Sequence, residues 1–211
     1  MLIPFSSVYQ YIQSLGKSIS GILHVGAHLC EEKDDYNRHG IQDKDIIWID
    51  GNMSLVKQLK ELKIPNIYHA LIDEKEVSQK FYITNNGQSS SLLELGEHAT
   101  LYPHVVVSET QIQNTIRIDT FFKTNNIDPS LLNFWNFDIQ GVELQALKSA
   151  GDLLKFAEFL YLEVNTQEIY KGCSKLNEID YFLEEKGFQR IAMQIYDNDG
   201  WGDAFYVRIR S

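Results

Sequence analysis

The stretch Gly21-Ile22-Leu23-His24-Val25-Gly26-Ala27-His28, together with Ile46-Ile47-Trp48-Ile49-Asp50, decides the fold of this chain. The first apolar run is of strand type and ends in a glycine turn. A charged segment of helix length follows, and the second apolar run closes with an aspartate. Consecutive apolar residues are typical of strands buried in a parallel sheet, so we expect Gly26 and Asp50 on the tips of two neighbouring parallel strands. Such tips bind a nucleoside, through backbone amides at the turn and a carboxylate that accepts from the ribose hydroxyls.

Strand and helix patterns alternate along the rest of the chain. Further strands are predicted at residues 67–72, 80–84, 115–118, 134–139, 159–164, 188–196 and 204–209. Helices are predicted at residues 6–15, 31–39, 55–62, 142–150 and 176–187, the first of them capped by Ser6 or Ser7. This order implies a parallel sheet with right-handed crossovers, to which a terminal hairpin turning at residues 197–200 adds one antiparallel strand. An irregular insertion at about 85–114 interrupts the alternation, and its serine-rich loop favours a lid over a substrate.

Composition limits the class of protein. A length of 211 residues fits a single domain, and 44% apolar residues are enough for a sizeable core. No apolar run reaches the roughly 18–20 residues of a membrane span, and the N-terminus lacks a signal-peptide pattern, so we expect a soluble, cytoplasmic protein. The net charge of −10 and the lack of Lys and Arg clusters argue against a nucleic-acid substrate. Cys30 and Cys173 show no zinc or disulfide spacing and are expected to be reduced thiols.

The nucleoside interpretation depends on Gly26 and Asp50. A dinucleotide fingerprint requires three glycines, but Gly26 stands alone and Glu31 would repel a pyrophosphate. An ordinary turn between a strand and a helix also explains a lone glycine. Asp50 follows Gly26 by 24 positions, near the interval of about 20 expected for a ribose carboxylate. Asp50 is alternatively a helix cap, although Asn52 is the better cap for the next helix.

A second group of polar residues follows the later strands. Asp138 ends the strongest predicted strand, at the edge where open α/β sheets bind ligands. Glu163 and Asn165 end the next strand and are expected on the same rim. Asp138 can orient an acceptor, act as a base or cap the following helix. The three side chains together form either a hydrogen-bonded wall or an oxygen-ligand site for a cation, and their spacing favours the wall.

The segment at 136–151, Asn136-Phe137-Asp138-Ile139-Gln140-Gly141-Val142-Glu143-Leu144-Gln145-Ala146-Leu147-Lys148-Ser149-Ala150-Gly151, resembles the FkbM-like family of S-adenosylmethionine-dependent methyltransferases. Leu160-Tyr161-Leu162-Glu163-Val164 is similar to the next strand of that family, Val25-Gly26-Ala27 to its cofactor turn, and Ser89-Ser90-Ser91-Leu92 to a loop in its insertion. The resemblance covers about residues 20–210. It implies an α/β, Rossmann-like methyltransferase sheet of seven strands, six parallel and one antiparallel.

The chain departs from the family pattern at four positions. His24 stands where the family usually has Asp, His28 where it has Asn, and Cys30 where it has Gly. The second strand ends in Asp50, where the family usually has Glu. The acidic residue missing at position 24 is the one expected to contact the amino group of the cofactor.

The resemblance implies a methyltransferase that uses S-adenosylmethionine, with O-methylation of a hydroxyl on a small molecule or sugar as the expected reaction. Asp138 and Glu163 are then the catalytic candidates, and Asp138 lies close to the transferred methyl group. The residues expected to bind the cofactor are His24, Gly26, Ala27, His28, Asp50, Asn52, Asp73 and Asp138. Asp50 would bind the ribose and Asp73 would approach the adenine. No metal, nucleic-acid or membrane partner is expected.

Two other functions remain open at this stage. A nicotinamide-dependent oxidoreductase is disfavoured by the missing second and third glycines. A non-catalytic nucleoside-binding module of the same fold is compatible with the departures at His24 and Cys30.

Overall fold

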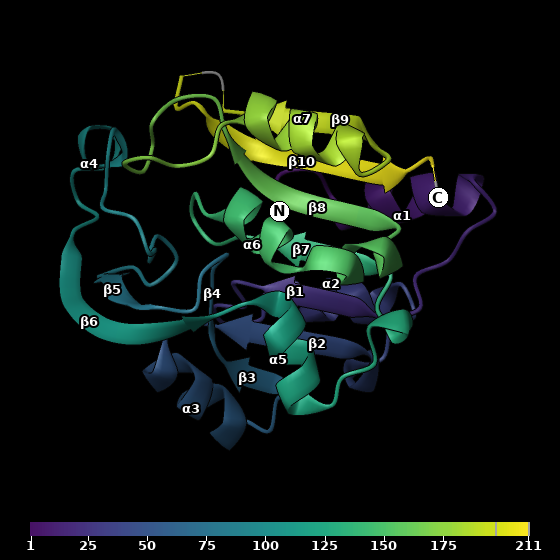
Figure 1. The fold of residues 1–211 in the computed structure, drawn as a ribbon, viewed down its shortest axis with the longest axis horizontal. Coiled ribbons are helices and arrows are strands. Elements are labelled where there is room, and N and C mark those ends of the chain that lie inside the picture. The colour runs from purple at the N-terminus through teal and green to yellow at the C-terminus, as the bar shows by residue number, and fades with distance from the viewer. Residues whose placement is uncertain (197, 211) are drawn as a thin grey trace.

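The main sheet runs through the whole molecule in a computed structural model that describes residues 1–196 and 198–210 (Figure 1). Within these residues the sheet has seven strands in the order β3-β2-β1-β7-β8-β10-β9. They are β3 (Ile67–His69), β2 (Ile46–Asp50), β1 (Ile22–Val25), β7 (Phe134–Phe137), β8 (Phe159–Asn165), β10 (Trp201–Arg208) and β9 (Phe188–Ile195). β10 is antiparallel to both of its neighbours, and the other pairings are parallel. The predicted sheet of six parallel strands and one antiparallel strand is confirmed.

Helices cover both faces of this sheet. They are α1 (Phe5–Ser14), α2 (Lys33–Arg38), α3 (Met53–Glu61), α5 (Ile118–Asn125), α6 (Glu143–Ser149) and α7 (Leu176–Glu185). The short helix α4 (His98–Leu101) lies in the insertion, away from the sheet (Figure 1). Short 3₁₀ turns lie at Asp43–Asp45, Pro129–Leu131 and Gly151–Phe156. Apolar residues of α5, α6 and α7 pack on one face, and those of α1, α2 and α3 pack on the other. None of the helices described here is long and apolar enough to cross a membrane.

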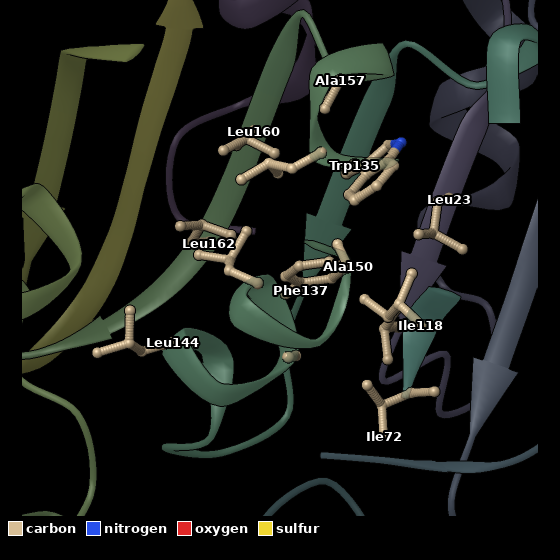
Figure 2. Packing of buried hydrophobic residues seen from close by; sticks show 14 of the residues in the cluster. Leu23, Ile72, Ile118, Trp135, Phe137, Leu144, Ala150, Ala157, Leu160 and Leu162 are labelled. Atoms are coloured by element: carbon tan, nitrogen blue, oxygen red, sulfur yellow. The ribbon is translucent and has the colours of Figure 1, made fainter. Parts of the chain in front are cut away.

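The core holds the central strands rigidly on both sides. Figure 2 shows Leu23, Trp135 and Leu160 projecting from β1, β7 and β8 into the layer under α5, α6 and α7. The intervening residues of these strands, such as Ile22 and Phe134, enter the opposite layer. Each fully buried side chain of this size contributes roughly 1.5–3 kcal/mol. The strand tips beyond this core are therefore fixed points from which functional side chains project.

A second, three-stranded sheet carries the insertion. Its order is β4-β6-β5, with β4 at Leu71–Ile72, β6 at Val107–Ile116 and β5 at Ser78–Thr84 (Figure 1). The prediction of a single strand at 67–72 is wrong. It divides into β3 and β4, because Ala70 donates to the carbonyl of Asp50 and Ile72 then pairs with Ile116 of the small sheet.

Other local predictions need correction. The predicted strand at 115–118 is the end of β6, which already begins at Val107, so the insertion at about 85–114 is not irregular throughout. β6 ends at Ile116, and Ile118 begins α5, a helix that the sequence pattern did not indicate. The first helix begins after Pro4, whose carbonyl accepts from Ser7 N and Val8 N, so neither Ser6 nor Ser7 caps it. Of the predicted turn at 197–200, Asp197 lies outside the described residues, and 198–200 join β9 to β10.

Gly26 lets the tips of β1 and β7 approach each other. Its φ is +91°, and a Cβ built on it would lie 1.8 Å from the carbonyl oxygen of Asp138. The amide of Asp138 donates to the carbonyl of Val25 at 2.9 Å, which holds the two tips together. A side chain at position 26 would therefore separate the turn after β1 from Asp138.

We predict that Gly26→Ala destabilises the protein more than Gly40→Ala does. Gly40 has a similar φ of +88°, but nothing lies within 4 Å of a Cβ placed there. Both variants carry the left-handed backbone penalty of about 1–2 kcal/mol, and only Gly26→Ala adds a clash of about 1–3 kcal/mol. Urea unfolding of both variants measures the difference, and equal losses would show that the contact with Asp138 is easily relaxed.

Candidate active site

A cavity of about 540 Å³ opens at the carboxyl ends of β1, β2, β7 and β8. Residues 86–92 of the insertion, with Tyr102 and Trp201, also line it. The volume lies in the range of about 300–1,000 Å³ that is usual for small-molecule sites. The main sheet, the insertion and the terminal hairpin thus enclose one site.

The turn after β1 is held by its own hydrogen bonds. The amides of Gly26 and Ala27 both donate to the carbonyl of Ile49, at 2.9 and 3.0 Å, and the amide of His28 donates to Asp50 Oδ2 at 2.8 Å. These amides join β1 to β2, contrary to the expectation that they meet a ligand. Gly26 and His28 line the cavity, whereas Ala27 is buried in the core behind it.

Two residues of this turn adopt left-handed conformations. His28 has φ of 40° and Cys30 has φ of 57°. Asn and Gly, which the related family usually carries at these positions, tolerate such angles better than most residues. His28 compensates through a contact of 2.6 Å between Nδ1 and Glu31 Oε1, and this hydrogen bond raises the pKa of His28.

Asp50 faces the cavity at the tip of β2. Its Oδ2 accepts from the amide of His28, and its Oδ1 accepts from the amide of Asn52 at 2.7 Å. Burial raises the pKa of Asp50. A carboxylate has about four acceptor sites, so capacity for two ribose hydroxyls remains. Asn52 itself caps α3, because its Oδ1 accepts from Ser54 N and Leu55 N, and it does not line the cavity.

His24 lies at the bottom of the cavity and is 2% exposed. Its Nδ1 is 3.1 Å from the hydroxyl of Tyr36, which accepts from Asn136 Nδ2 at 2.9 Å. Because Tyr36 already accepts from Asn136, its proton is free for His24 Nδ1. Burial lowers the pKa of His24, so the ring is neutral and keeps a donor at Nε2.

Carboxylates gather at the tips of β7, β8 and β10. Asp138 is exposed to the cavity, whereas Glu163 is 5% and Asp203 is 6% exposed. Glu163 and Asp203 are paired residues of adjacent strands. Burial, and then the neighbouring charge of Asp138, raise the pKa of Glu163 well above its usual value. Burial likewise raises the pKa of Asp203, although Tyr161 and the amide of Leu2 donate to it.

Glu143 supports the loop that carries Asp138. It is fully buried, and its Oε1 accepts from the amides of Ile139 and Gly141 at 3.0 and 3.1 Å. Burial raises the pKa of Glu143 to about 7. In the described part of the chain, no group of three or more His, Cys, Asp or Glu side chains is arranged to hold a metal ion.

Besides Ala27 and Asn52, two more of the predicted residues lie outside the cavity lining. Asp73 does not line it, and its carboxylate accepts from the amide of Glu74 and from Gln79 Nε2. Asn165 is fully buried, also outside the lining, and its side-chain amide is without a hydrogen-bond partner among the described residues.

Other residues of the cavity were missed in the sequence. An apolar wall beside Asp50 is formed by Ala70, Leu71, Ile72 and Phe81. Asp203 was also missed, although an acidic residue inside an apolar strand was a usable signal. The wall could not be predicted, because Phe81 belongs to β5 and reaches Asp50 only through the pairing of the small sheet.

The cavity is strongly acidic. Its six acidic side chains are Glu31, Glu32, Asp50, Asp138, Glu163 and Asp203. Within the described residues, no Lys or Arg lines it. Burial raises the pKa of Asp50, Glu163 and Asp203, and the positive charges of His28 and of the N-terminal ammonium only partly oppose this at Asp50 and Asp203. The site therefore suits a ligand that carries positive charge.

A model of the methyltransferase FkbM domain matches residues 29–190, and the chain belongs to this family. The methyl donor of the family is S-adenosylmethionine. Among solved structures, the chain is similar to magnesium protoporphyrin IX methyltransferase from Synechocystis PCC 6803 with bound S-adenosylhomocysteine, with 11% identity, coverage of 96% and 81% of the two chains and a TM-score of 0.50. It is also similar to an rRNA methylase from Streptococcus thermophilus, with 11% identity, coverage of 98% and 97% and a TM-score of 0.48. No curated protein matches the chain.

At this identity the likeness to the porphyrin enzyme shows the fold alone. The strand order of the main sheet agrees with this likeness, since each indicates a Rossmann-like methyltransferase sheet. The resemblance found in the sequence is thereby confirmed at the level of family and fold.

We predict that Glu143 makes the unliganded protein less stable as the pH rises. Its pKa is about 7 in the folded protein against 4.5 for an ordinary glutamate. Its contribution to the free energy of unfolding is therefore fully present below about pH 4.5 and is lost as the pH rises through 7. From about pH 5 to about pH 8, the parent should lose up to about 3 kcal/mol relative to Glu143→Gln, since one pKa unit corresponds to about 1.4 kcal/mol.

Thermal or urea unfolding of both proteins at the two pH values tests this. His24 and His98, whose pKa values are lowered by burial, act in the opposite direction in both proteins and cancel in the comparison. If the free energy of unfolding changes equally with pH in the parent and in Glu143→Gln, the raised pKa of Glu143 is wrong.

Proposed function

We propose that this chain is an S-adenosylmethionine-dependent O-methyltransferase acting on a hydroxyl of a small molecule or sugar. The observation that carries the proposal is the acidic cavity without Lys or Arg among its described lining residues, in a chain of the FkbM methyltransferase family. We further propose that residues 1–211 form one domain, with the insertion at about 85–114 as part of its site.

The cavity fits the chemical groups of this cofactor. The sulfonium and the amino group are cationic and suit the carboxylates, because opposite charges stabilise each other most where water is excluded. Asp50 has the acceptor capacity for the ribose diol, and Leu71 and Phe81 beside it suit the adenine ring. His24, with a donor at Nε2, replaces the acidic residue of the family and would face the methionine end.

Asp138 and Glu163 have different tasks in this proposal. When bound, the cofactor supplies a methyl group on a sulfonium, which the acceptor oxygen takes by in-line displacement with departure of a thioether. Asp138, exposed to the cavity, accepts the proton as the O–H bond of the acceptor breaks. Glu163 is buried beside it and keeps its own proton, because two carboxylates in contact are not both ionised at neutral pH.

The acidic cavity also bears on the alternatives. A pyrophosphate or a nucleic-acid phosphate would meet Glu31 and Glu32 without a Lys or Arg in the described lining, and the turn amides are already bonded. Calorimetry with S-adenosylhomocysteine and with NAD separates a methyltransferase from an oxidoreductase. Transfer of an isotope-labelled methyl group to small molecules of a cell extract separates an enzyme from a non-catalytic module.

We predict that Asp50→Ala weakens binding of S-adenosylhomocysteine by roughly 10- to 150-fold, the equivalent of about 1.5–3 kcal/mol of charge-assisted hydrogen bonds. Asn52→Ala is the matched control. It removes the cap of α3 and costs about 1 kcal/mol of stability, but leaves the affinity unchanged because Asn52 does not line the cavity. Equal affinity of Asp50→Ala and parent, with both folded, would remove Asp50 from the ribose site.

We also predict that Asp138→Asn lowers the rate of methyl transfer by about 10²–10⁴-fold and leaves S-adenosylhomocysteine binding nearly unchanged. The substitution keeps the size of the side chain and removes the base. Asp73→Asn, the same change outside the cavity, should keep full activity. Full activity of Asp138→Asn would leave Asp138 with a structural role only.

A further inference from the structure

Gln140 connects the two carboxyl groups that the proposed mechanism uses. Its Nε2 donates to Asp138 Oδ1 at 2.6 Å and also to Glu163 Oε2. Asp138 follows β7 and Glu163 belongs to the adjacent strand β8, so one side chain spans both strand tips. Gln140 itself lines the cavity.

Both donors of this amide are used. An amide nitrogen has two N–H donors, and here each carboxyl group takes one of them. The amide oxygen accepts from the hydroxyl of Tyr170, which is itself fully buried. The hydroxyl of Tyr170 on one side and the carboxylate of Asp138 on the other favour this orientation of the amide.

The backbone of Gln140 is held in place from the insertion. Its φ is 59°, a left-handed conformation that costs a non-glycine residue about 1–2 kcal/mol. The hydroxyl of Ser91, which is 2% exposed, donates to the carbonyl of Gln140 at 2.8 Å. The next amide, that of Gly141, donates to Glu143. Contacts on both sides of the residue thus maintain a conformation that an isolated loop would not adopt.

We propose that Gln140 is a positioning residue, which holds Asp138 and Glu163 side by side so that they share a single proton and Asp138 stays ionised toward the acceptor. The role of Asp138 as base rests on the proposed function, whereas the pairing of the two carboxyl groups does not. One N–H of Gln140 stabilises the ionised Asp138, and the other bonds to the carboxyl group of Glu163 and keeps it beside Asp138.

Other titratable groups face this pair from every surrounding element. They are His24 of β1, His28 of the following turn, Glu143 of α6, Asp203 of β10 and Tyr170 of the loop after β8. Glu143 and Asp203 add negative charge and favour protonation of the pair. Gln140 is the uncharged donor that opposes this effect.

Carbon-13 NMR of the side-chain carboxyl groups, in the protein without ligand, tests the proposal. The signals are assigned by their loss in Asp138→Asn and in Glu163→Gln. Gln140→Asn suits the left-handed backbone but is too short to reach both carboxyl groups. Gln140→Glu keeps the length and replaces the donors with a third carboxyl group. Gln145→Leu is the control, because Gln145 lies outside the cavity and bonds to Ser174.

In the parent, the two signals should titrate in two coupled steps. In Gln140→Asn, the ionisation of the pair should move upward by about one to two pH units, the loss expected for a charge-assisted hydrogen bond. Gln140→Glu should move it further, and Gln145→Leu should not move it. If Gln140→Asn and Gln140→Glu both titrate like the parent, the positioning role is wrong.

Methyl transfer provides a second readout. The pH profile of the transfer rate in Gln140→Asn should be shifted to higher pH than in the parent, because its base ionises at higher pH. Binding of S-adenosylhomocysteine should be retained. An unchanged pH profile would overturn the link to catalysis. Failure of the parent itself to bind S-adenosylhomocysteine would overturn the proposed function, and the NMR result on carboxyl pairing would stand independently.

Discussion

The contact between Gly26 and the backbone of Asp138 is the constraint on which the site depends. Residues 22–25 of β1 pair in register with 46–49 of β2 on one side and with 134–137 of β7 on the other, so all three tips end at the same level. The missing side chain at Gly26 then lets the loop of Asp138 approach the turn after β1. As a result, Asp50, His28 and Asp138 line one cavity although they are far apart in sequence.

The buried carboxylates of the cavity lower the stability of the unliganded protein. Burial raises the pKa of Asp50, Glu163 and Asp203, which means that ionisation of these carboxyl groups destabilises the folded protein near neutral pH. A well-packed apolar lining would be more stable. Stability given up at a site is common where the ligand supplies the compensating charge, and a sulfonium cofactor would supply it here. The acidity of the cavity is therefore better explained by binding than by folding.

The sequence predicted the architecture but not the connections within the site. Apolar runs without alternation identified 46–50 as a buried strand, and β2 has those bounds. By contrast, α5 was missed because its first residue continues the apolar pattern of β6, and β3 and β4 were merged because their separation depends on pairing with Ile116. The bonding of the turn amides to Ile49 and the bridge made by Gln140 depend on distant segments, which no local pattern encodes.

Departures from the family pattern acquire a physical meaning in the structure. Cys30 occupies a left-handed position where glycine would be unstrained, yet the residue is 4% exposed and packs in the core with residues of α1 and α2. Burial raises the pKa of Cys30 to about 12, so it is a packing residue and not a nucleophile. His24 is similarly enclosed, by Tyr36 and Trp48, and stays neutral. Cys30 therefore adds core packing at a strained backbone position, and His24 adds core packing where the family has an acidic group. The negative charge that a cationic cofactor requires is left to Asp50, Asp138 and Glu163.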